Sequence, residues 1–371
     1  MRATTSIDQY GSAISFNGRL ALTAADDIYY GGGSGHFNIT SGDSGSLFLE
    51  AAYARINATG DLSISNWITR TSTIASSLIV GGDLSVGLIK AVDLNIRVVG
   101  DLTDLSDDDD DLRTVDISAT GTITLDIDGD FGASDRYVEV ATSRAGSAEG
   151  LLTGQIDGAA FIRAVDTDLY LGNLVVTGNA TVRSAGSVLD GDSTDDDSAL
   201  GTADLTANAI DIQVLSGDIG ALTNALEINS TSSTVGVRLD AEDDIFVSED
   251  AGDLIVADIT ASLTGGLVAL YSAQSIRTAG SFNASVPTLR SNALRLIAGQ
   301  NESASDVTIQ LAVETDEIQR VSSPTSATVV NHGDVVIADD DASLTWSAGD
   351  DLTFRAMSPV TVEGDISSYT D

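Results

Sequence analysis

The stretch ITLDIDGDF, residues 123–131, contains the two features that decide the fold of this chain. Along its first five positions, apolar residues alternate with Thr and Asp. This period of two is typical of a β-strand with one buried and one solvated face. A Gly-Asp pair, Gly129 and Asp130, then follows, and these two residue types are typical of turns.

The same alternation recurs along the chain. It begins or fills the stretches LSISNWI (62–68), IDIQV (210–214), VGVRL (235–239) and VTIQLAV (307–313). Hydrophobic residues make up 42% of the chain but aromatic residues only 5%, so the core is expected to consist of Val, Ile, Leu and Ala. No convincing amphipathic helix with caps is found. The sequence therefore predicts an all-β protein.

The turn pair also recurs. Gly followed by Asp or Asn begins at Gly60, Gly82, Gly100, Gly129, Gly172, Gly178, Gly217, Gly252, Gly333, Gly349 and Gly364. We expect glycine to supply a positive φ and the acidic or amide side chain to bond the backbone of its own turn. Several spacings lie near 20 residues, which predicts a parallel β-helix, or β-solenoid, with coils of about 20 residues. About 18 coils stacked roughly 4.8 Å apart would form a rod about 85 Å long.

An immunoglobulin-like sandwich is the alternative architecture. Its larger aromatic core residues fit this composition less well than the narrow interior of a solenoid does. With no Pro-rich or Ser-rich linker, residues 1–371 are interpreted as a single elongated domain. Loop insertions are expected near 103–113, 132–150 and 190–203, two of which contain aspartate runs.

The net charge of −39, from 56 acidic and 17 basic residues, argues against nucleic acid as a partner. The absence of cysteine excludes disulfides and Cys-based zinc sites, and two histidines make a His-rich metal site improbable. No apolar run reaches the length of a membrane helix, so no membrane insertion is expected in this segment. The N-terminus has no signal-peptide core, and we interpret the chain as a segment of a longer protein.

The stretch ADLTANAIDIQVLSGDIGALTNALEINST, residues 203–231, resembles the repeats of filamentous-haemagglutinin-like adhesins and related giant bacterial exoproteins. DIFVSEDAGDLIV (244–256) and GDVVIADDDASLTWSAGDDLTF (333–354) have the same texture. The resemblance covers most of the chain from about residue 165. It implies a right-handed β-helix and an extracellular or cell-surface location. It does not extend to a catalytic signature.

The tetrapeptide GDSG, residues 42–45, resembles the nucleophile motif of chymotrypsin-like proteases. A protease would require Ser44 to meet a histidine and an aspartate in space. His36 is only eight residues upstream, and His332 lies in the wrong order for that family. We interpret the tetrapeptide as a turn, and no catalytic residue is predicted.

Asp126, Asp128 and Asp130 have the alternate spacing with which a calcium loop opens. Phe131 and Tyr137 stand where an EF-hand would need Gly and an acidic residue. The three aspartates are therefore weak calcium candidates, and the alternative interpretation is the solvated face of a strand. No cofactor is assigned beyond calcium or other cations.

The leading functional hypothesis is a non-enzymatic structural or adhesive rod in a large secreted or cell-surface protein. One alternative is a subunit that polymerises end to end into an extracellular fibre. Another is a β-helical polysaccharide-active enzyme that uses paired carboxylates. Expected partners are further copies of the chain, or a cell-surface or matrix component.

Overall fold

The computed structural model describes residues 60–69, 75–105, 115–142, 150–165, 168–191, 202–300, 306–338 and 347–362, and before residue 60 only the strands. In these residues the protein is all-β, without a helix. Contacts divide the chain into two units, Met1–Ala185 and Gly186–Asp371, and each is described by itself. The single domain expected over 1–371 stays a prediction.

The described strands of unit 1, in chain order, are β1 (Ile7–Gln9), β2 (Ile14–Phe16), β3 (Arg19–Thr23), β4 (Ile28–Tyr30), β5 (Asn38–Ser41), β6 (Ser46–Ala51), β7 (Arg55–Ala58), β8 (Leu62–Thr69), β9 (Ser76–Val80), β10 (Leu84–Val86), β11 (Ile89–Ala91), β12 (Leu94–Val98), β13 (Leu102–Asp104), β14 (Ile117–Ala119), β15 (Ile123–Ile127), β16 (Val138–Thr142), β17 (Leu152–Ile156), β18 (Ala160–Ala164), β19 (Leu169–Val176) and β20 (Ala180–Ser184).

The described strands of unit 2 are β21 (Val188–Asp190), β22 (Leu205–Ala207), β23 (Ile210–Val214), β24 (Leu226–Ser230), β25 (Val237–Ala241), β26 (Ile245–Glu249), β27 (Leu254–Thr260), β28 (Leu267–Ser272), β29 (Ile276–Thr278), β30 (Leu289–Ala298), β31 (Thr308–Ser323), β32 (Ser326–Asn331), β33 (Val335–Ile337), β34 (Ser347–Ala348), β35 (Asp351–Ala356) and β36 (Val360–Val362).

In unit 1 the strands pair in parallel with strands two or three places away in the chain, rather than with their sequence neighbours. The column β9, β12, β15 and β17 illustrates this pairing. Its register places branched apolar residues beside one another, since Leu94 lies beside Ile123 and Val98 beside Ile127. The alternating apolar residues of β15 all point into the core, and Ile123 is fully buried. The predicted period of two is thus confirmed in this strand.

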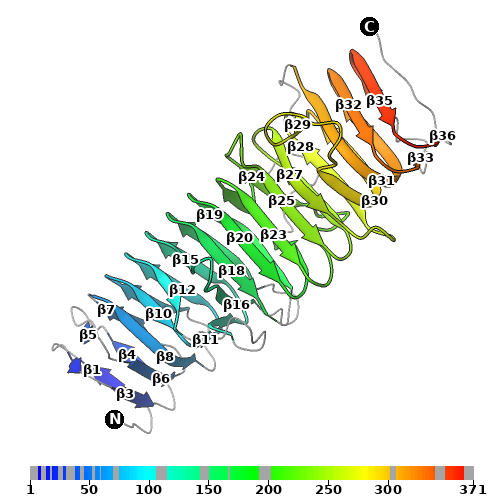
Figure 1. Ribbon diagram of the computed structural model, residues 1–371. Helices are drawn as coiled ribbons and strands as arrows, with labels where there is room; N and C mark the ends of the chain where they lie inside the picture. Colours follow the sequence, from blue (N-terminus) through cyan, green and yellow to red (C-terminus); the bar gives the residue numbers. More distant parts are fainter. Residues whose placement is uncertain are drawn as a thin grey trace. The chain divides into compact units, whose positions relative to one another are not determined.

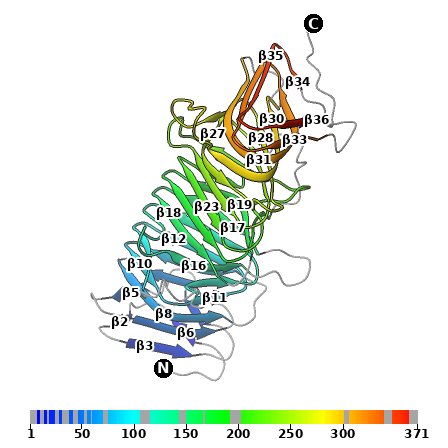
Figure 2. The same ribbon diagram turned by 45° about the vertical axis from the view of Figure 1, so that its right-hand side comes forward.

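The strands of unit 2 also pair in parallel, but here β30 with β31 and β31 with β32 are neighbours in the sequence. Strands β28, β30, β31 and β32 pair in parallel, each with the next, and lie side by side in Figures 1 and 2. The longest, β31, contacts β30 along one edge and β32 along the other. Its apolar residues, among them Ile309, Leu311 and Val313, are buried. The core of this unit therefore also consists of small and branched apolar side chains.

The number of residues between paired positions varies more than the sequence predicts. Leu84 pairs with Leu102, 18 residues on, whereas Ile276 pairs with Ile309, 33 residues on. The predicted period of about 20 residues therefore describes only the shorter steps. Longer steps include extra chain between strands. Within the insertion expected at 132–150, residues 138–142 form strand β16 because Val138, Val140 and Thr142 alternate inward.

The Gly-Asp pairs hold the strand layers of unit 1 together. The carboxylate of each aspartate in this series accepts a hydrogen bond from a backbone N–H of the next layer. The bonds run from Asp83 N to Asp61 Oδ1 (3.0 Å), Asp101 N to Asp83 Oδ1 (3.0 Å), Asp130 N to Asp101 Oδ1 (2.8 Å) and Ala159 N to Asp130 Oδ1 (2.7 Å). We call this series the aspartate ladder. It bonds the next layer's backbone, not the aspartate's own turn.

The ladder explains the glycines. A Cβ at Gly82 would overlap the Asp61 carboxylate, and a Cβ at Gly100 would overlap that of Asp83. Positive φ is not the reason: of the described glycines in these pairs, only Gly217 has it, at 111°. The expected conformational role is therefore wrong for the other described pairs. At Gly82, Gly100 and Gly129, glycine is required because the aspartate of the layer before occupies the place of a side chain, whereas a Cβ at Gly60 would meet no atom within 4 Å.

Unit 2 has a corresponding series of shorter length. Its bonds run from Asp218 N to Ser187 Oγ (3.0 Å), Asp244 N to Asp218 Oδ1 (2.9 Å) and Leu267 N to Asp244 Oδ1 (2.7 Å). A Cβ at Gly217 would overlap the Ser187 hydroxyl. In both units, therefore, a polar side chain at a turn accepts a hydrogen bond from the backbone of the next layer.

Candidate functional site

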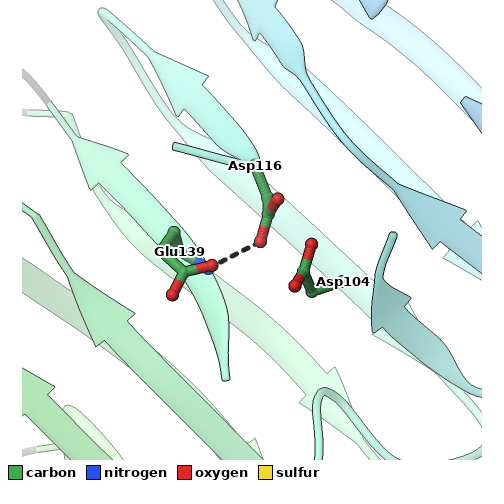
Figure 3. A group of neighbouring side chains, drawn as sticks. All are labelled: Asp104, Asp116 and Glu139. Carbon is green, nitrogen blue, oxygen red and sulfur yellow. Dashed lines mark hydrogen bonds between the residues drawn. The ribbon is translucent and has the colours of Figure 1, made fainter. Parts of the chain in front are cut away.

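Unit 1 contains a cluster of three buried carboxyl groups, Asp104, Asp116 and Glu139 (Figure 3). Asp104 ends β13, Asp116 directly precedes β14, and Glu139 is the second residue of β16. Each residue is at most 2% exposed, and one carboxylate oxygen of each lies within 4.8 Å of the others. We call this cluster the first carboxyl triad.

Backbone hydrogen bonds fix two of its members. The Glu139 N–H donates to Asp116 Oδ2 at 2.9 Å, and the Asp116 N–H donates to the Glu139 carbonyl at 3.0 Å. Because β14 and β16 pair in parallel directly after these residues, the strand register itself brings the two side chains together. Asp104 reaches the cluster because it occupies an inward position of β13, after Leu102.

Unit 2 contains a second carboxyl triad with the same construction, formed by Asp190, Asp204 and Glu227. Asp190 ends β21, Asp204 directly precedes β22, and Glu227 is the second residue of β24. The Glu227 N–H donates to Asp204 Oδ2 at 3.1 Å, and the Asp204 N–H donates to the Glu227 carbonyl at 2.9 Å. All three residues are at most 5% exposed.

The backbone around the two triads also matches. Gly132 (φ 73°) and Gly220 (φ 70°) each precede a short antiparallel bridge, Ala133 with Arg136 in one unit and Ala221 with Asn224 in the other. Numbered along the chain, these glycines lie 88 residues apart, as do the second and third members of the triads. The two segments therefore form an internal structural repeat.

Burial and mutual repulsion determine the protonation of both triads. Burial, with hydrogen bonding to Glu139, raises the pKa of Asp116 to about 10. Burial, with the neighbouring Asp190 and Glu227 carboxyls, raises the pKa of Asp204 to about 11. Three ionised carboxylates this close in a low-dielectric interior would repel one another strongly. At neutral pH each triad therefore holds at least one proton.

The triads differ in the charge beside them. Arg163 Nη1 lies 3.7 Å from Glu139 Oε1, and its guanidinium also lies over the Tyr137 ring at 5.1 Å. In unit 2, Ser248 takes the position in the register beside Glu227 that Arg163 takes beside Glu139. Three oxygen donors in each triad could also hold a hard cation such as calcium. The chemistry open to both is thus proton sharing or cation binding.

The predicted calcium residues do not lie together in one site. Asp126 and Asp128 both pair with Arg97, at 3.1 Å to Nε and 2.6 Å to Nη1, and the Asp128 hydrogen bond with Arg97 lowers the pKa of Asp128. Asp130 instead belongs to the aspartate ladder. These contacts place Asp126 and Asp128 on the outer face of the unit. Calcium binding by the three residues stays a prediction.

One further residue that the sequence singled out is described: the Nε2 atom of His332 lies 2.9 Å from the Ala284 carbonyl oxygen, and no acidic side chain among the described residues pairs with it. The remaining residues and runs that the sequence singled out lie outside the described residues. These are Ser44 and His36, and the acidic runs at 107–111 and 195–197. The triads themselves were not predicted from the sequence. A usable signal was present, because Asp104 in LTD and Asp190 in VLD each stand where strand alternation predicts an apolar residue.

Comparisons of the chain with protein-family models, curated proteins and solved structures give no match. The described ranges contain no helix with the length and apolar character needed to cross a membrane.

Proposed function

We propose that this chain is a right-handed parallel β-solenoid that acts as a non-enzymatic structural rod within a large secreted or cell-surface protein. The observation that carries the proposal is the aspartate ladder, together with the parallel register on which it is built. The aspartate side chains at these turns form hydrogen bonds that connect one layer to the next. Such repeated nearest-layer contacts suit a stiff spacer.

Each part of the layer contributes to stiffness. Backbone hydrogen bonds connect the parallel strands of successive layers, and apolar residues stack on apolar residues inside. Aspartate side chains bridge the layers at the turns. Each exposed turn bond is worth about 1 kcal/mol or less, so the contribution comes from repetition. The extracellular location rests on the resemblance of the repeats to filamentous-haemagglutinin-like adhesins.

The test is the shape of the purified protein in solution. Negative-stain electron microscopy and small-angle scattering are expected to give discrete rods of uniform width, with a β-sheet circular dichroism spectrum. A compact globule would contradict the rod. A hydrolytic activity on polysaccharides that is lost on changing one carboxylate would contradict the non-enzymatic role.

A fibre subunit is the second candidate, and the exposure of β35 and β36 favours it. Val360 and Val362 are 43% and 54% exposed, whereas their partners in β33, Val335 and Ile337, are almost fully buried. A further layer over β36 would cover these side chains, and a second copy of the chain could supply it. Filaments that lengthen with protein concentration, and disappear with Val360→Asp, would support this candidate.

A further inference from the structure

A polar groove on unit 2 has the features of a small-molecule binding site. Its volume is about 250 Å³, and it lies between the turn after β24 and the turn after β26, with β29 alongside. This is a little below the roughly 300–1,000 Å³ of drug-sized pockets, so it has room for a single ring. The lining residues used below are Asn229, Ser233, Ala251, Gly252, Asp253 and Arg277.

The charged groups of the groove neutralise one another. Arg277 Nη2 lies 2.7 Å from Asp253 Oδ2, and Asp253 Oδ1 accepts the Ser275 N–H at 3.0 Å. Asp253 is the one carboxylate among the lining residues, and the positive charge of Arg277 beside it disfavours a second cation there. A guanidinium carries five N–H donors, so Arg277, with 47% of its side chain exposed, still has donors for a neutral acceptor.

The rest of the groove combines hydroxyl, amide and apolar surface. Within the described residues the Asn229 amide and the Ser233 hydroxyl make no side-chain hydrogen bond to the protein. Ala251, which is exposed, supplies apolar surface to the lining, next to Ile255, which is only 3% exposed. The Ser232 hydroxyl accepts the Val235 N–H at 3.0 Å and so fixes the wall formed by this turn.

We propose that this groove binds a neutral, polyhydroxylated ring, such as one hexose unit of a glycan. Such a ring presents C–H groups to Ala251 and hydroxyls to the Asn229, Ser233 and Arg277 side chains. An anion is disfavoured because Asp253 already neutralises Arg277 and the chain carries a net charge of −39. A cation is disfavoured because the one carboxylate of the lining, Asp253, already pairs with the positively charged Arg277.

The test uses saturation-transfer NMR and calorimetry on the full chain, with glucose, galactose and N-acetylglucosamine as neutral probes. Glucuronate and glucosamine serve as the charged probes. We expect at least one neutral sugar to bind with millimolar affinity, and the charged analogue to bind less well. The proposal is overturned if no neutral probe binds, or if a charged probe binds best.

A groove-filling variant ties binding to this place. Gly252 lines the groove, its φ is not left-handed, and a Cβ there would meet no atom within 4 Å, so Gly252→Leu should fold and occupy the site. Gly265 has the same open surroundings elsewhere in unit 2, which makes Gly265→Leu the matched control. We expect Gly252→Leu to weaken binding about tenfold or more and Gly265→Leu to leave it unchanged. Equal effects, or none, would refute the assignment.

Removal of the positive charge provides a second, independent readout. Arg277→Gln takes away donors at the groove, whereas Arg290→Gln breaks a pair with Asp258 (3.1 Å) on another strand. Only the first is expected to weaken sugar binding, with both variants keeping the circular dichroism spectrum of the parent. Equal binding by the two variants would show that Arg277 does not contact the sugar. None of these outcomes depends on whether the chain is a rod.

Discussion

Replacing Asp116 by asparagine should change how the stability of unit 1 depends on pH. The folded-state pKa of Asp116 is raised to about 10 by burial and by hydrogen bonding to Glu139. Below its unfolded pKa of about 4 the carboxyl is protonated in both states. Between about pH 4 and pH 10 the folded chain holds one proton more than the unfolded chain, so stability falls as pH rises.

The size of the effect follows from proton linkage. One extra bound proton gives a slope of about 1.4 kcal/mol per pH unit, or about 4 kcal/mol between pH 5 and pH 8 as an upper value. Asparagine keeps the oxygen that accepts the Glu139 N–H and carries no titrating proton. We therefore expect Asp116→Asn to match the parent near pH 5 and to be more stable at pH 8.

The assay is urea unfolding from pH 5 to pH 9 in the presence of EDTA, followed by tryptophan fluorescence. In a Trp346→Phe background the single remaining tryptophan is Trp67, which is fully buried in unit 1 and reports on that unit. The control is Asp126→Asn, which makes the same substitution at a side chain that is 61% exposed. An unchanged slope in Asp116→Asn, or lower stability than the parent at pH 8, would refute the reasoning.

Three further predictions test the layer contacts and the buried polar groups. Gly121→Ala should cost about 1–3 kcal/mol in urea unfolding because its Cβ would overlap the Asp93 carboxylate, whereas Gly60→Ala, with nothing within 4 Å, should cost much less. Combining Gly121→Ala with Asp93→Ala should lower stability by less than the sum of the single changes, and simple additivity would contradict the overlap of this Cβ with the Asp93 carboxylate. Burial raises the pKa of Glu249 to about 7, so the stability of the parent should fall by at most about 3 kcal/mol between pH 4.5 and pH 7. In Glu249→Gln this fall should be absent, and a difference between the two proteins that is confined to higher pH would contradict the prediction. Trp67→Phe should alter the unfolding free energy by only about 1 kcal/mol, since no acceptor among the described residues meets its buried Nε1–H, and a loss above about 3 kcal/mol would argue against this.

Strand identity could be predicted from the sequence because it depends on local alternation. Residues 123–127 form a strand with its apolar residues inside, and the turn with Gly129 and Asp130 follows it, as the alternation and the turn pair predict. The role of the glycine could not be predicted in the same way. It depends on Asp101, whose carboxylate lies where a side chain at Gly129 would be, and that neighbour is known only once the layers are in register.

The members of the carboxyl triads were even harder to predict from the local sequence. Asp104 and Glu139 are 35 residues apart, and nothing in either local pattern indicates that they meet. Only the inward position of Asp104 in β13 marked it as unusual. By contrast, the calcium spacing of Asp126 and Asp128 was visible locally. In the structure both side chains form ion pairs with Arg97, which lies on a different strand, and local spacing cannot predict such a contact.

Burying three carboxyl groups in one place is costly compared with burying apolar side chains of the same size. Within the described residues this chain nevertheless does so twice, at corresponding places in two units. In each case the first two members bracket the segment that contains an aspartate run, 105–115 in one unit and 191–203 in the other. A protonated carboxyl group can both donate and accept a hydrogen bond. Through such bonds a triad can connect the strand before the segment, the strand after it and the following layer. Apolar side chains cannot form these hydrogen bonds. Because that junction needs a proton, or a cation in its place, the base of each acidic segment is where a change of pH or of divalent cation should act first on the fold.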